Sequence, residues 1–270
     1  MSTFNFNGKK INYRVIGEGT PLLILNGIMM STKSWEPFEK AFTKHNTKLI
    51  LLDLMDQGES EKYDTDFDQS LQVEVVKSLL DELKLDKVNI MGTSYGGEVA
   101  LQFAVKYQER IERLVLANTV ARTNAWLKEI GEAWNCAVDN PLAYYSTTIP
   151  VIYSPQFYDR KAEWMNNRKE VLTKTAFASK DFLNSMIRLT NSANNHDVIN
   201  LLSTIKVKTL IIGSDQDHIT PLEEQRLMVK LMPNAELVIL PDTGHASFYE
   251  RPLVFTSLLM GFIHAEEVIV

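Results

Sequence analysis

Short apolar runs alternate along most of the chain with longer stretches that are apolar on one side and polar on the other. The runs are too short for helices and are apolar throughout, as expected for strands covered on both faces of a sheet. Alternation of such strands with helices predicts an α/β fold with a mostly parallel central sheet. The predicted strands are 22–25, 49–52, 88–91, 114–116, 209–212 and 237–240, and the predicted helices lie near 34–45, 68–84, 95–107, 221–232 and 249–263.

The alternation of predicted strands and helices is interrupted near residue 120. Residues 121–200 contain no comparable apolar run and are rich in aromatic residues and asparagine. We therefore expect a core of residues 1–120 and 201–270, with a helical cap inserted at 121–200. Most of the cap's aromatic residues should pack inside the cap, and the rest should line an apolar slot that excludes water from a site below. At the N-terminus, residues 1–14 alternate between apolar and polar and predict strands.

The sequence Gly92-Thr93-Ser94-Tyr95-Gly96 lies between a predicted strand and a predicted helix. A tight strand-to-helix turn of the form G-x-S-x-G projects its serine hydroxyl from the top of a sheet, and the helix behind it favours developing negative charge. The alternative without a catalytic role is a serine that only caps the helix. The strand, turn and helix context favours Ser94 as a nucleophile.

A serine nucleophile needs a base, and the chain has five histidines. His245 follows the strand at 237–240, and loops at the carboxyl ends of strands carry the chemistry of open α/β sheets. We therefore predict that His245 is the base. His45 and His264 lie among charged residues and are expected at the surface. His196 is expected in a loop or at a helix start.

The third member of such a triad holds the histidine in one tautomer. The loop 213–221, after the strand at 209–212, contains two candidates, Asp215 and Asp217. Asp217 is favoured because Thr220-Pro221 follows it and starts the next helix. Asp215 lies nearer the strand and is able to cap the loop through backbone hydrogen bonds instead.

These motifs, in this order, resemble the α/β-hydrolase fold with a helical cap. The similarity extends over about residues 10–120 and 203–262, and it includes Asn26-Gly27 followed by Trp35, and the Asp-x-x-x-x-Gly-x-Ser pattern at 53–60. The resemblance implies a serine esterase or lipase-like activity. It also implies an oxyanion hole made by the backbone N–H groups of Ile28 and Tyr95, with each donor worth about 2.7–4 kcal/mol of transition-state stabilisation.

The chain departs from the family pattern at two places. The family usually has histidine where this chain has Asn26, and a Gly-His pair where it has Asp56-Gln57. Asn-Gly resembles a bacterial subgroup that includes hydroxyacyl acyltransferases. Asn26 is either a donor toward a substrate oxygen or a simple turn residue before glycine. We name Asn26, Met29 and Gln57 as substrate-binding candidates, with Met29 and Met30 lining the apolar slot.

Composition limits the kinds of partner, cofactor and location that we expect for the chain. The chain has 270 residues, 45% of them hydrophobic, and a net charge of −6, which argues against nucleic acid or an anionic membrane as a partner. Cys136, the only cysteine, has no internal disulfide partner, and its helical spacing with Trp134 predicts burial. No signal peptide, membrane span, metal spacing or phosphate-binding glycine pattern is apparent. We expect a cytoplasmic protein without a cofactor or metal, and the oligomeric state stays open, a homodimer included.

Together these features predict a serine hydrolase that cleaves small-molecule esters or thioesters of small to medium apolar acyl groups. An acyltransferase that moves a 3-hydroxyacyl or other acyl group to an alcohol uses the same machinery. A non-catalytic ligand-binding protein of the same fold is the alternative from another class. A serine nucleophile argues against the dehalogenase and epoxide-hydrolase reactions, for which this fold normally uses aspartate.

Overall fold

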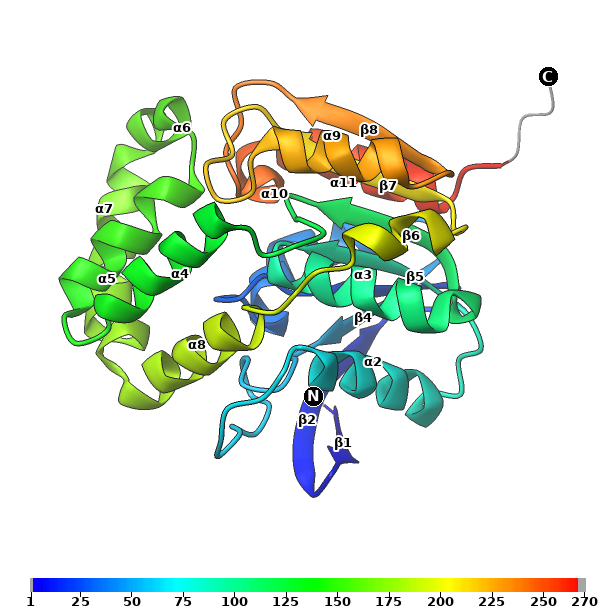
Figure 1. Cartoon of the computed structure of the whole chain (residues 1–270), viewed down its shortest axis with the longest axis horizontal. Coiled ribbons are helices and arrows are strands. Elements are labelled where there is room, and N and C mark those ends of the chain that lie inside the picture. Colours follow the sequence, from blue (N-terminus) through cyan, green and yellow to red (C-terminus); the bar gives the residue numbers. More distant parts are fainter. Residues whose placement is uncertain (1, 267–270) are drawn as a thin grey trace.

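The computed structural model describes residues 2–266 and contains an eight-stranded sheet in the order β1-β2-β4-β3-β5-β6-β7-β8 (Figure 1). The β1–β2 and β2–β4 pairs are antiparallel, and all pairs from β4–β3 to β7–β8 are parallel, which confirms the predicted α/β fold with a mostly parallel sheet. The strands are β1 (Ser2–Phe6), β2 (Lys9–Ile16), β3 (Thr20–Leu25), β4 (Thr47–Leu52), β5 (Val88–Thr93), β6 (Ile111–Ala117), β7 (Thr209–Ser214) and β8 (Ala235–Leu240).

Helices cover both faces of this sheet. Successive side chains of a strand point to opposite faces, so Leu23 and Leu25 pack in one core cluster while Leu22 and Ile24 pack in the other. The first cluster contains side chains of α2, α3 and α9, and the second contains side chains of α1 and α11. The helices of the core are η1 (Thr32–Phe38), α1 (Glu39–Thr43), α2 (Ser70–Glu82), α3 (Tyr95–Tyr107), η2 (Gln108–Arg110), α9 (Leu222–Leu231), α10 (Ser247–Glu250) and α11 (Pro252–Ile263).

Strand β8 differs from its prediction as a buried strand. Three of its six residues are half-exposed and two are exposed, among them Ile239 at 39%. The reason is topological, because β8 is the last strand in the sheet and pairs with β7 alone. An apolar run of this length does not distinguish an edge strand from a central one.

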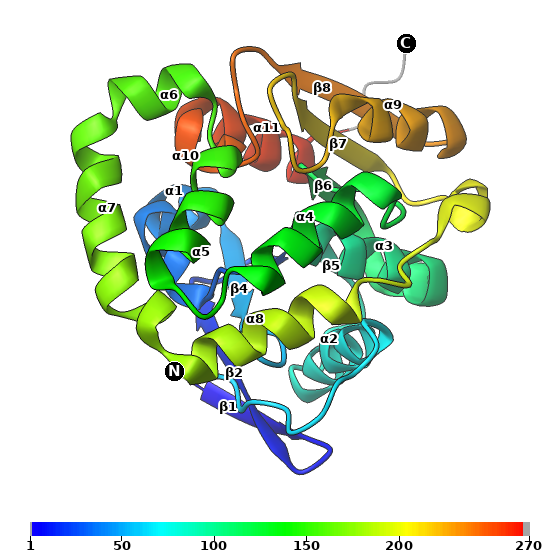
Figure 2. The ribbon, with the colours of Figure 1, turned by 60° about the vertical axis from the view of Figure 1, so that its left-hand side comes forward.

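The regular elements between β6 and β7 are all helical, and those within residues 125–192 gather on one side of the core (Figures 1 and 2). The two connections of this helical segment to the core run side by side, with the Thr123 N–H donating to the His196 carbonyl and the Val198 N–H to the Ala121 carbonyl. The elements of this helical segment are α4 (Ala125–Cys136), α5 (Pro141–Thr148), η3 (Pro150–Ile152), α6 (Pro155–Arg160), α7 (Ala162–Lys174), η4 (Ala176–Ala178) and α8 (Lys180–Ser192). The short helix η5 (Ile199–Thr204) follows them and packs against α3 and α9 of the core.

Aromatic rings form the interior of the helical segment. Tyr144 and Phe177 are fully buried and meet edge to face with ring centroids 4.8 Å apart, and Tyr145 lies beside them. Trp126, in contrast, is 53% exposed. Cys136 is also exposed, so the prediction that it is buried is wrong. Trp134 takes the buried position on α4, and a residue two positions further along a helix faces away from it.

A buried ion pair joins the helical segment to the core. The Asp56 side chain has no exposed surface, and Arg188 of α8 donates to it through Nε at 2.7 Å and Nη2 at 2.8 Å. Two parallel bonds between a guanidinium and a carboxylate fix orientation as well as distance. Asp56, which stands at a position where the family pattern has glycine, therefore fixes α8 to the loop after β4. Among residues 2–266, no helix has the length and apolar character required to cross a bilayer.

Candidate active site

Ser94 occupies the turn between β5 and α3 in a strained conformation. Its φ of 52° and ψ of −125° lie in a region that non-glycine residues rarely adopt. The turn is this tight because the first turn of α3 lies directly against the neighbouring strand. A Cβ on Gly96 would collide with the Leu25 carbonyl oxygen, and one on Gly92 would collide with the Gly96 carbonyl oxygen. The two glycines therefore permit the close packing that presents the Ser94 hydroxyl.

The structure brings together the three residues predicted as a triad. His245 Nε2 lies 2.9 Å from Ser94 Oγ, and His245 Nδ1 lies 2.8 Å from Asp217 Oδ2 and 3.0 Å from Oδ1. A carboxylate at Nδ1 accepts a hydrogen bond, so the proton of the neutral ring is assigned to Nδ1. Nε2 is then the acceptor for the Ser94 hydroxyl, which is the arrangement that a general base requires.

Asp217 is held as a carboxylate although it is fully buried. Burial by itself would raise the pKa of Asp217, but the adjacent His245 and hydrogen bonds from Thr220 outweigh it and hold this pKa below its usual value. The N–H groups of Ile219 and Thr220 donate to Oδ1, each at 2.9 Å, and Asn118 Nδ2 donates to Oδ2 at 3.0 Å. These donors fix the carboxylate in the orientation that meets the imidazole.

The competing aspartate lies elsewhere. Asp215 is exposed, and its Oδ1 accepts a hydrogen bond from the Thr243 backbone N–H at 3.3 Å. It thus ties its own loop to the loop that carries His245, which is the capping role considered for it. His45 and His218 are exposed, whereas His264 is half-buried, with its Nε2 at 2.8 Å from the Thr47 hydroxyl.

The loop after β3, which carries the predicted oxyanion turn, is held from below by buried side chains. Asn26 Nδ2 donates to the Leu52 carbonyl at 2.7 Å, and its Oδ1 accepts from Trp35 Nε1 at 2.8 Å. Gln57 Nε2 donates to the Gly27 carbonyl at 3.0 Å. Neither Asn26 nor Gln57 is among the residues that line the cavity at Ser94. Their polar groups are used to fix the turn.

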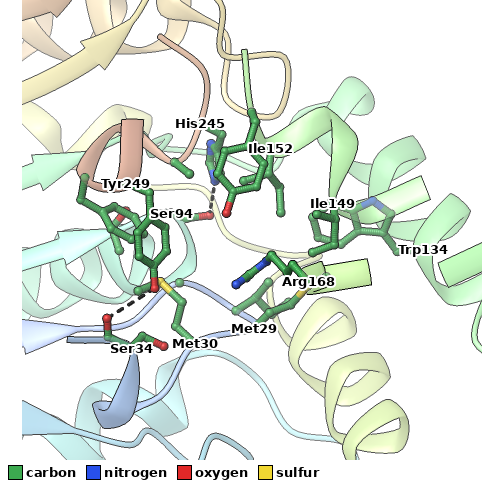
Figure 3. A pocket seen from close by; sticks show the side chains of 16 residues that line it. Met29, Met30, Ser34, Ser94, Trp134, Ile149, Ile152, Arg168, His245 and Tyr249 are labelled. Atoms are coloured by element: carbon green, nitrogen blue, oxygen red, sulfur yellow. Dashed lines mark hydrogen bonds between the residues drawn. The ribbon is translucent and has the colours of Figure 1, made fainter. Parts of the chain in front are cut away.

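Ser94 opens into a cavity of about 100 Å³ between the core and the helical segment (Figure 3). Met29 and Met30 form part of its wall, where the sequence predicts them, together with Ile28. A second cavity, of about 60 Å³, shares Ile28, Ser94 and Trp134 with the first, and Tyr95 lines it. Trp134 and Tyr153 are two of the aromatic residues of 121–200, some of which were expected to line the slot. The lining residues that no sequence signal identified are Ser34, Ile149, Ile152, Arg168, Ala246, Phe248 and Tyr249.

Glu250 fixes the position of the histidine loop. Its buried carboxylate accepts hydrogen bonds from the Gly244 N–H at 3.1 Å, the Ser154 N–H at 2.8 Å and the Ser154 hydroxyl at 2.5 Å. Ser154 also caps α6 by accepting a hydrogen bond from the Phe157 N–H. One carboxylate therefore links the residue before His245 to the helical segment, so His245 is positioned by both parts of the protein.

A chain of buried polar side chains begins at Glu98, which lines the second cavity. Glu98, one turn after Ser94 on α3, accepts from Gln69 Nε2 at 2.8 Å, and Gln102 connects Gln69 to the buried His196. Burial raises the pKa of Glu98 to about 8 and lowers that of His196 to about 4, so both groups are neutral near pH 7. Among the described residues, no three or more His, Cys, Asp or Glu side chains are grouped to hold a metal ion.

Glu98 makes stability depend on pH in a defined direction. Its folded pKa of about 8 lies above the ordinary value of 4.5, so between these values the folded protein keeps a proton that the unfolded chain has lost. Stability therefore falls as pH rises through this window, by at most about 1.4 kcal/mol per pH unit. We expect Glu98→Gln to remove this contribution, since an amide accepts the Gln69 hydrogen bond without ionising.

The measurement is urea unfolding of both proteins at pH 5 and pH 8.5. The wild type is expected to lose stability between the two conditions relative to Glu98→Gln, and the exposed Glu109→Gln is expected to follow the wild type. An equal pH dependence in wild type and Glu98→Gln would show that Glu98 ionises normally in the folded protein.

Comparisons with known proteins agree with this architecture. The family described as alpha/beta hydrolase fold matches residues 20–252. The crystal structure of MGS-M2, an alpha/beta hydrolase enzyme from a Medee basin deep-sea metagenome library, is 47% identical, with a TM-score of 0.97 over 100% of this chain and 99% of that one. A poly(3-hydroxyalkanoate) depolymerase of Ectopseudomonas oleovorans is 29% identical over 92% of this chain and 85% of its own. A putative carbamate hydrolase, RutD, of Pseudomonas savastanoi pv. phaseolicola is 27% identical over 91% of this chain and 95% of its own.

Proposed function

The chain belongs to the alpha/beta hydrolase fold family, and from that premise we propose that it is a serine hydrolase of carboxylic esters or thioesters that acts through an acyl-enzyme on Ser94. The observation that carries this proposal is the continuous hydrogen-bond relay from Ser94 through His245 to Asp217 at the wall of a cavity. A hydroxyl that donates to a neutral imidazole, itself oriented by a carboxylate, is the arrangement that activates serine for acyl transfer.

The first half-reaction forms the acyl-enzyme. Ser94 Oγ attacks the carbonyl carbon while its proton passes to His245 Nε2, and Asp217 stabilises the resulting imidazolium. The carbonyl oxygen becomes an oxyanion, for which we assign the backbone N–H groups of Ile28 and Tyr95 as donors. The tetrahedral intermediate then collapses, the bond to the leaving oxygen or sulfur breaks, and His245 gives its proton to the leaving group.

The second half-reaction repeats these steps with water. His245 takes a proton from the water, whose oxygen attacks the acyl carbon of the ester on Ser94. Collapse of the second tetrahedral intermediate breaks the bond to Ser94 Oγ, which regains a proton from His245, and the carboxylic acid leaves. An alcohol in place of water gives a new ester by the same route, which is the acyltransferase alternative.

We also propose that the helical segment, residues 121–200, acts as a cap over a core of residues 1–120 and 201–270. It contributes Trp134, Ile149, Ile152 and Tyr153 to the cavity wall. An apolar roof reduces the water near the acyl-enzyme and strengthens the electrostatic interactions within the site. The name of the Ectopseudomonas oleovorans relative, a depolymerase of a polyester, supports an ester as the substrate class.

Product partitioning is the experiment that separates hydrolysis from transfer. We expect para-nitrophenyl esters from acetate to dodecanoate to be cleaved with mostly free acid as product, because hydrolysis is the commoner outcome in this fold. Each methylene that the cavity accommodates adds up to ~0.8 kcal/mol, so kcat/KM should rise by up to about four-fold per carbon and fall once the cavity is full.

A second set of reactions contains a simple alcohol or a 3-hydroxyacyl compound as acceptor. Mass spectrometry then measures the ratio of free acid to new ester. If most acyl groups appear in the new ester at acceptor concentrations far below that of water, the chain is an acyltransferase. If no ester is turned over at all while acyl compounds still bind, the non-catalytic alternative holds.

A further inference from the structure

Arg168 of α7 brings a positive charge to the cavity at Ser94, and none of residues 2–266 forms an ion pair with it. The arginine is half-buried and lines the cavity, and its guanidinium points into the space between the core and the helical segment (Figure 3). Its Nε is buried and makes no hydrogen bond within residues 2–266. No aspartate or glutamate is among the described residues that line this cavity. The charge is therefore partly removed from water, and the described residues do not neutralise it.

Aromatic rings hold the side chain in this direction. The guanidinium lies over the Trp164 ring, 5.3 Å from its centroid, and Trp164 in turn meets Tyr153 edge to face at 6.0 Å. Tyr249, from the core, lies 6.4 Å from Trp164 and also lines the cavity. The aromatic contact occupies one face of the planar group and leaves its N–H edge available for a ligand.

A partly desolvated and unpaired charge is costly, so a binding site that retains one gains affinity when a ligand supplies the opposite charge. The planar guanidinium matches the two oxygens of a carboxylate through parallel hydrogen bonds. We propose that Arg168 forms an anion subsite, and that the preferred substrates are esters or thioesters with a carboxylate in the part of the molecule that fills this cavity. This inference rests on the proposed function and names the substrate class for it.

A carboxylate fits this cavity better than a phosphate. Arg168 is the only lysine or arginine among the described residues of the cavity wall, and most of the other lining side chains are apolar or aromatic. One guanidinium balances the single charge of a carboxylate, whereas a phosphate monoester carries about two charges and would leave one uncompensated in an apolar surrounding. The subsite also refines the prediction of a purely apolar slot, because the sequence around Arg168 is polar and resembles a solvated helix face.

The test compares substrates that differ only in the carboxylate. One pair carries it on the acyl side, as the mono-para-nitrophenyl ester of glutarate against para-nitrophenyl pentanoate. The other pair carries it on the leaving group, as para-acetoxybenzoate against phenyl acetate. In at least one pair the wild type is expected to favour the carboxylate ester in kcat/KM, and Arg168→Met is expected to reduce kcat/KM for that ester by about 10- to 100-fold. The neutral ester should lose less than the charged one, so the ratio of the two kcat/KM values is the quantity that reports recognition of the carboxylate.

Two further variants separate charge recognition from structure. Arg168→Lys keeps the charge without the planar fork and should restore part of the preference. Arg160→Met is the matched control, because Arg160 also lies over an aromatic ring of the helical segment, at 5.7 Å from the centroid of Phe157, but is exposed and does not line the cavity. Arg160→Met should leave both members of each pair unchanged.

The inference fails if the wild type favours the neutral ester in both pairs, or if Arg168→Met slows neutral and charged esters equally. Should Arg168→Met fold poorly, Arg168→Gln, also neutral and still polar, takes its place in the same comparison. Failure of the proposed function has a different signature, since Ser94→Ala would then retain turnover of the neutral esters regardless of any effect at Arg168.

Discussion

Replacing Ser94 with alanine is expected to lower kcat by about 10⁴- to 10⁶-fold on every ester that the wild type hydrolyses. The substitution removes the Oγ that is acylated in the proposed mechanism and that lies 2.9 Å from His245 Nε2. No other hydroxyl lies within hydrogen-bonding distance of this nitrogen in the described structure, so no neighbouring side chain is placed to substitute for the nucleophile. Steady-state release of para-nitrophenol measures the effect.

Ser34→Ala is the matched control for this variant. Ser34 lines the same cavity, but its hydroxyl accepts a hydrogen bond from the Ser31 N–H and does not reach His245. Its loss should change kcat by less than about ten-fold, because it removes no group of the relay. A fluorophosphonate probe should label the wild type and Ser34→Ala at Ser94. Turnover at the wild-type rate in Ser94→Ala would transfer the nucleophile to another residue.

The sequence predicted the elements whose signals are local. The helix at 95–107 has the same bounds in α3 of the structure, because the glycines at the turn and the apolar run that precedes it restrict the backbone in a small window. The sequence also predicted that Ser94, Asp217 and His245 lie close together. Each follows the carboxyl end of a parallel strand, and these ends meet at one edge of the sheet. The three residues are far apart in the sequence, but the order of the strands in the sheet brings them together.

Contacts made by the helical segment were not predictable in this way. Arg168, Arg188 and Glu250 have no local signal that separates them from surface charges, and their directions depend on how α7, α8 and α10 pack against the core. The same dependence explains the exposed Cys136, since helical spacing identifies a face but not which neighbour occupies it. A parallel sheet constrains its loops through strand order, whereas an inserted helical segment is constrained only by tertiary packing.

Asp217→Asn is expected to lower kcat by about 10⁴-fold, the loss that accompanies this change in a serine-protease triad. The carboxylate accepts the Nδ1–H of His245 at 2.8 Å and leaves Nε2 as the acceptor for Ser94. An asparagine side chain has only one oxygen. We expect this oxygen to occupy the position of Asp217 Oδ1, because the N–H groups of Ile219 and Thr220 donate there. The NH₂ group of the asparagine then faces the imidazole, and this donor favours the tautomer in which Nε2 carries the proton and no longer accepts from serine.

Asp215→Asn provides the control within the same loop. Asp215 accepts one hydrogen bond, at 3.3 Å, from a backbone N–H, and an amide oxygen replaces that acceptor, so we expect a change in kcat below about ten-fold. Because Asp217 is buried and accepts several hydrogen bonds, its variant also loses stability. Both variants are therefore assayed well below their unfolding temperatures, with kcat expressed per folded molecule from circular dichroism. A larger loss in Asp215→Asn than in Asp217→Asn would assign the orienting role to Asp215, and equal small losses would mean that His245 keeps its working tautomer without a carboxylate.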